Sequence, residues 1–194
     1  MRKIAISLLA CILSGCIVQK VNIYRPTNEG GRYEQRYRGL LNISYGKTLK
    51  GKTSINLSGA TKDKSDFGLF LQISVEKGSR VELDSWAVRL SSPDFEKDLT
   101  VPIGRLSVSI YGRGGKAGHY GYIEPGQVLV GEALNEEVDK TVADAFITSI
   151  QVKENAPEQL SVTLPDFIID GSRITVPAIK FDLIEDYNYV YSIQ

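Results

Sequence analysis

The sequence predicts an all-β fold, an antiparallel β-sandwich with immunoglobulin-like architecture. Many segments after residue 36 alternate apolar and polar residues, which is the period of a strand with one buried face. Clusters of Gly, Asp, Asn and Ser separate about ten such segments at near-regular spacing, as in two-sheet β-proteins. Hydrophobic residues make up 42% of the 194 residues and charged residues 24%, so the composition is that of a globular protein with a core.

The first fifteen residues predict a secretory signal peptide. Residues 1–3 are a short basic start, residues 4–13 are almost wholly apolar, and the small residues Ser14 and Gly15 follow. The apolar run is shorter than the roughly 20 residues that a membrane-spanning helix needs. Residues 1–15 are therefore excluded from the fold prediction.

The end of this segment, Leu13-Ser14-Gly15-Cys16, resembles the lipobox of bacterial lipoproteins. The resemblance implies cleavage after Gly15, a diacylglyceryl group on the Cys16 sulfur and an acylated new N-terminus. Two or three acyl chains make a stable membrane anchor, since each buried CH₂ contributes about 0.8 kcal/mol. Residue 17 is Ile rather than the Asp that usually retains Gram-negative lipoproteins in the inner membrane. The resemblance therefore implies the outer membrane, facing the periplasm, if the source is Gram-negative.

Residues 16–35 are predicted to be a membrane-proximal tether, with a short strand at 21–24 and breaks at Pro26, Gly30 and Gly31. Residues 20–52 carry eight Lys and Arg against two acids, whereas residues 154–194 carry seven acids against two bases. Basic residues near an anionic bilayer each add about 1 kcal/mol of attraction. The candidates for membrane-surface contact are Arg32, Arg36 and Arg38. The alternative is a solvated segment whose charges serve solubility alone.

The β-sandwich domain is predicted to span residues 36–194. Its alternating segments are 41–45, 54–58, 67–75, 81–90, 106–111, 146–152, 160–164, 167–169, 174–176 and 179–183. One short helix is predicted near 135–142, because Asn135 is a good N-cap, acids follow it, and Val138 and Val142 lie one turn apart.

The glycine-rich segment 111–122 is the candidate binding loop of the domain. It holds five glycines and the single histidine of the chain. The cations would meet an anion and the tyrosines would stack on a ligand. The alternative is a flexible hairpin loop between strands. The candidate binding residues are Arg113, Lys116, His119, Tyr120 and Tyr122.

The composition excludes several function classes. One His and two Cys give no basis for a zinc or disulfide framework, so no metal and no cofactor are expected. A formal net charge of zero gives no support for nucleic-acid binding. The expected function is a lipid-anchored binding or structural module of the cell envelope, with no catalytic residues. The alternatives are a subunit of a multi-protein envelope or secretion assembly, docked on an envelope protein partner, and a periplasmic enzyme of unknown reaction.

Overall fold

A computed structural model describes residues 16–28, 32–37, 40–61, 64–111, 117–132 and 143–191. These residues form antiparallel strands and contain no helix, which confirms the all-β prediction. The short helix predicted near 135–142 lies outside the described residues. The strands are β1 (Cys16–Pro26), β2 (Arg32–Tyr37), β3 (Leu40–Lys50), β4 (Thr53–Thr61), β5 (Phe67–Glu76), β6 (Arg80–Leu83), β7 (Ala87–Ser91), β8 (Leu99–Pro102), β9 (Leu106–Tyr111), β10 (Ala117–Ile123), β11 (Leu129–Val130), β12 (Ala143–Val152), β13 (Gln159–Thr163), β14 (Phe167–Ile169), β15 (Ser172–Ile174) and β16 (Ile179–Tyr191).

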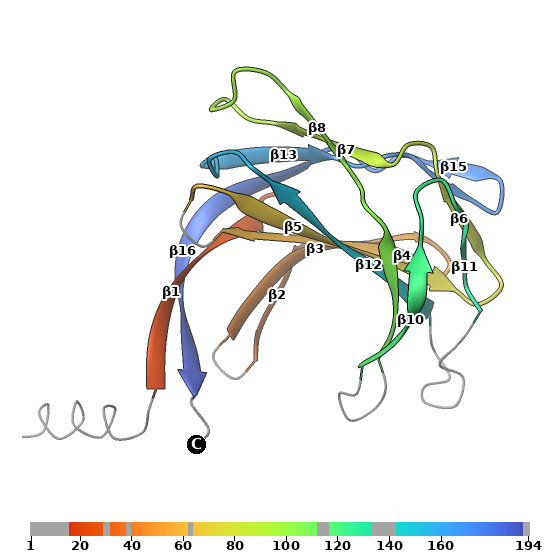
Figure 1. Cartoon of the computed structure of the whole chain (residues 1–194), viewed down its shortest axis with the longest axis horizontal. Coiled ribbons are helices and arrows are strands. Elements are labelled where there is room, and N and C mark those ends of the chain that lie inside the picture. The colour runs from red at the N-terminus through yellow and green to blue at the C-terminus, as the bar shows by residue number, and fades with distance from the viewer. Residues whose placement is uncertain are drawn as a thin grey trace, which may run out of the picture.

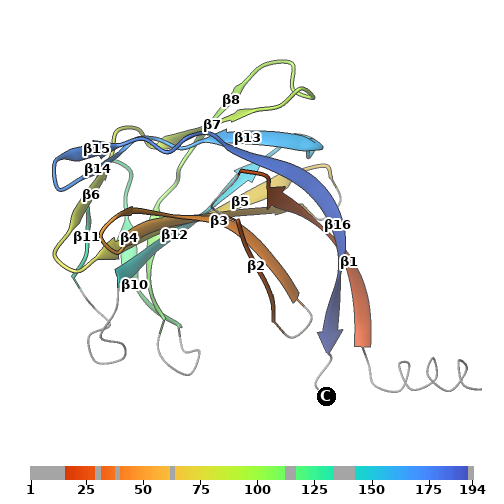
Figure 2. The ribbon, with the colours of Figure 1, turned by 180° about the vertical axis from the view of Figure 1, so that it is seen from behind.

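Most strands belong to one large sheet that curls on itself (Figure 1). Its order is β10-β9-β12-β5-β4-β1-β16-β13-β7-β8, and β3 pairs with both β4 and β2. A second sheet, in the order β11-β6-β14-β15, lies at the end of the molecule opposite β1 and β16 (Figure 2). The structure therefore confirms that the fold is built from antiparallel strands. The immunoglobulin-like sandwich of two comparable sheets is not confirmed, because one sheet takes up most of the strands.

The core follows the predicted alternation closely in β5. Its odd-numbered residues from Phe67 to Val75 are at most 1% exposed, whereas the residues between them reach the surface. β4 pairs with one edge of β5 and β12 with the other, so these three strands form the centre of the large sheet. Each fully buried Leu, Ile or Phe contributes about 1.5–3 kcal/mol through removal of apolar surface from water.

Tyr24 ties β1 into this core. Its side chain is completely buried, and its ring lies edge-on to Phe67 and Phe181 at centroid distances of 5.6 and 6.3 Å. Its hydroxyl donates a hydrogen bond of 3.1 Å to the carbonyl oxygen of Pro157. Aromatic pairs of this geometry add about 0.5–1.5 kcal/mol each beyond their burial.

β1 differs from the tether predicted over residues 16–35. It pairs with β16 along its whole length, from Cys16 opposite Tyr191 to Pro26 opposite Phe181, and it also pairs with β4. Within the described residues, the sheet therefore begins at Cys16, whereas the sequence predicted a domain that starts at residue 36. The physical reason is the burial of Tyr24, which requires a fixed strand around it.

Removal of the Tyr24 hydroxyl is expected to destabilise the fold. Tyr24→Phe keeps the ring but leaves the Pro157 carbonyl without this donor, at a cost of about 1–2 kcal/mol. Urea unfolding at pH 7 measures the difference. The matched control is Tyr45→Phe, since Tyr45 is also buried but its hydroxyl makes no hydrogen bond within the described part of the chain. Equal losses in the two variants would contradict the proposed role of the Tyr24 hydroxyl.

The same variant has a predictable pH dependence. Burial, reinforced by the charge of Asp94, raises the pKa of Tyr24 above its ordinary value. The hydroxyl therefore stabilises the fold fully below about pH 10, and this contribution is lost at higher pH as the unfolded state ionises first. The difference in unfolding free energy between the native protein and Tyr24→Phe should narrow above that pH.

Candidate functional site

Cys16 is the first residue of β1 and pairs with Tyr191 near the end of β16. The two strands run together away from the second sheet and end at one extremity of the molecule (Figure 1). Tyr24 lies eight residues further along β1, which corresponds to about 26 Å of extended strand. The predicted lipidation residue therefore stands at the free end of a paired ribbon, far from the aromatic cluster of the core.

The candidate membrane-contact residues are only partly described. Arg32 and Arg36 belong to β2, where they pair with Tyr45 and Leu41 of β3, and Arg38 lies outside the described residues. β2 pairs only with β3 within the described part of the large sheet, so it forms a side branch of that sheet. Figure 2 shows the β2–β3 hairpin and the β1–β16 ribbon projecting on the same side of the molecule.

The glycine-rich segment forms part of the β9–β10 hairpin. Arg113 and Lys116 lie outside the described residues, and His119 of β10 pairs with Ser109 of β9. The register shifts between His119 and Gly121, so Tyr120 stands in a bulge. The structure thus places His119, Tyr120 and Tyr122 on one strand without bringing the predicted set together in a described pocket.

Tyr122 has a partner that the sequence analysis did not identify. Its ring is half exposed, and the Arg105 guanidinium carbon lies 4.1 Å from the ring centroid. A cation over an aromatic face at this distance contributes about 0.5–1 kcal/mol at an exposed site. Tyr122 of β10 therefore makes a cation–π contact with Arg105, which directly precedes β9.

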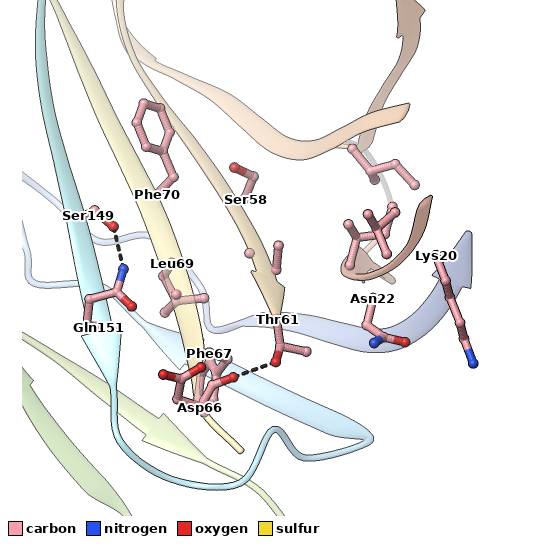
Figure 3. A pocket seen from close by; sticks show the side chains of 16 residues that line it. Lys20, Asn22, Ser58, Thr61, Asp66, Phe67, Leu69, Phe70, Ser149 and Gln151 are labelled. Carbon is pink, nitrogen blue, oxygen red and sulfur yellow. Dashed lines mark hydrogen bonds between the residues drawn. The ribbon is translucent and has the colours of Figure 1, made fainter. Parts of the chain in front are cut away.

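A surface hollow of about 590 Å³ is lined by residues of β1, β3, β4, β5 and β12 (Figure 3). We call it the β1–β5 hollow. Its size falls in the range of small-molecule binding sites, about 300–1,000 Å³. The polar side chains that line it are Lys20, Asn22, Ser58, Thr61, Asp66, Ser149 and Gln151, and the aromatic side chains are Phe67 and Phe70.

Asn22 is the unusual residue of the β1–β5 hollow. It is only 6% exposed, and its side-chain oxygen has no hydrogen-bond partner among the described residues. A buried polar atom left unpaired costs about 1–3 kcal/mol, so folded proteins rarely keep one without a reason. Asn22 pairs with Thr61 of β4 and with Glu185 of β16, which holds it between two strands at the wall of the hollow.

Phe70 supplies an exposed aromatic surface in the same hollow. It is 40% exposed, and its cross-strand neighbours are Ser58 on β4 and Ser149 on β12. Gln151 donates from its amide nitrogen to the Ser149 hydroxyl at 2.9 Å, which orients that amide. The next cross-strand row consists of Ala60, Gly68 and Gln151. Because Ala60 and Gly68 are small, little side-chain volume covers the sheet at these two positions.

Neither Asn22 nor Phe70 was predicted from the sequence. Phe70 occupies the outward phase of β5, where Gly68, Gln72 and Ser74 are its companions. A single exposed aromatic residue among small and polar ones is common on protein surfaces, so the sequence held no strong signal for Phe70. Asn22 gave no such signal, because its burial depends on the pairing of strands that are distant in sequence.

The described residues show no grouping of His, Cys, Asp and Glu that could hold a metal ion. The same residues contain no helix with the length and apolarity that a membrane span requires. Comparison with known proteins found no matching family model, no matching curated protein and no matching solved structure.

Gly121 fixes the bulge that precedes Tyr122. Its φ of 137° lies in a region that residues with a Cβ rarely adopt, although nothing stands within 4 Å of an added Cβ. Gly121→Ala should therefore cost about 1–3 kcal/mol through backbone strain alone. Gly104→Ala is the matched control, since Gly104 is equally open but has no positive φ. Urea unfolding of both variants checks this, and an unchanged Gly121→Ala would contradict the strain.

Proposed function

We propose that the protein is a lipid-anchored lipoprotein of the cell envelope and that its β domain serves as a binding or structural module. The observation that carries the proposal is the Leu13-Ser14-Gly15-Cys16 sequence directly after a basic and then apolar N-terminal segment. Removal of residues 1–15 leaves 179 residues with a side-chain charge of −2, because Arg2 and Lys3 are lost. In a Gram-negative source the expected location is the outer membrane, facing the periplasm.

The position of Cys16 is compatible with this anchoring. Since β1 begins at Cys16 and is paired from that residue, a lipid on its sulfur would be joined to the sheet itself. The domain would then stand on the paired β1–β16 ribbon, with little slack between the bilayer and the fold. A strand pair is stiffer than a single extended chain, so the orientation of the domain over the membrane would be restricted.

Binding is a better match than catalysis to the chemistry of the β1–β5 hollow. Amides and hydroxyls predominate among its polar groups, and these groups form hydrogen bonds at neutral pH without transferring protons. A general acid or base needs a titratable group in hydrogen-bond reach of the reacting atom. The hollow thus supports a role in recognition.

A subunit role in an envelope assembly is the second candidate. The pairing path of the large sheet ends at β8 and β10, so it has free strand edges in its described part. Free edges present unpaired backbone N–H and C=O groups, and a strand from a partner protein can pair with them. This observation favours a protein partner in addition to the membrane.

Cys16→Ser should abolish lipidation. The serine oxygen cannot replace the thiolate that accepts the lipid, so the precursor should remain uncleaved or the protein should lose its detergent-phase partitioning. Metabolic labelling with a radioactive fatty acid and membrane fractionation measure this. Cys11→Ser is the matched control, since Cys11 lies in the segment that is removed. Unchanged fatty-acid incorporation in Cys16→Ser would refute the lipoprotein proposal.

Charge in the β2 region is expected to strengthen contact with anionic lipid. Changing Arg32, Arg36 and Arg38 together to Gln should weaken binding to vesicles that contain phosphatidylglycerol, by about 1 kcal/mol per residue at low salt. Vesicle sedimentation at two salt concentrations measures this. The same three residues changed to Lys keep the charge and should bind normally. Equal binding by the Gln and native proteins would show that these arginines only solubilise the chain.

A further inference from the structure

We draw no further inference here: the strongest candidate, the hollow of about 460 Å³ between residues 94–99 and residues 154–158, is lined by the carboxylates of Asp94, Glu96, Glu154 and Glu158, and nothing in the described part of the chain shows which ligand or partner would cover this acidic cluster.

Discussion

The large sheet depends on the packing of Tyr24 between Phe67 and Phe181. These three rings come from β1, β5 and β16, so one cluster joins the beginning, the middle and the end of the chain. This packing reinforces the pairing path at its centre, since β1 is the link between β4 and β16. The hydroxyl bond to Pro157 adds the segment that leads into β13 to the same cluster.

The position of β1 in the sheet also determines where Cys16 and the β1–β5 hollow lie. β1 carries Cys16 at its free end, Asn22 at the wall of the hollow and Tyr24 in the core. Their spacing along one strand means that the anchor, the site and the core are mechanically connected. A lipid on Cys16 would therefore fix the position of the β1–β5 hollow relative to the membrane.

The local alternation of apolar and polar residues was sufficient to predict the central strands. In β5, every second residue from Phe67 is apolar, and the structure buries those residues. The pattern failed in β1, where Val21 and Ile23 alternate with Asn22 and Tyr24. The apolar pair is only partly buried there, and the polar pair is the buried one. Packing of Tyr24 against Phe67 and Phe181 determines which residues of β1 point into the core. These two residues are distant from Tyr24 in sequence, so the local alternation of apolar residues could not predict this orientation.

The same long-range pairing explains why the sequence directed attention to a different site. The glycine-rich segment is conspicuous because its unusual composition is contiguous, and part of it lies outside the described residues. The hollow takes Asn22, Ser58, Phe70 and Ser149 from four strands, each with an unremarkable local sequence. Only the registers of β4 with β5 and of β5 with β12 bring the two serines to the sides of Phe70.

The inverted phase of β1 has an energetic consequence. Had the strand turned Val21 and Ile23 inward, it would have buried two apolar side chains and left the Asn22 amide in water. The observed phase buries the amide with its oxygen unpaired, which lowers stability by about 1–3 kcal/mol. Tyr24 offsets this loss, because a buried aromatic side chain contributes more than an unpaired amide costs. The burial of Tyr24 thus allows β1 to keep the Asn22 amide in a buried position, although the unpaired amide alone destabilises the fold.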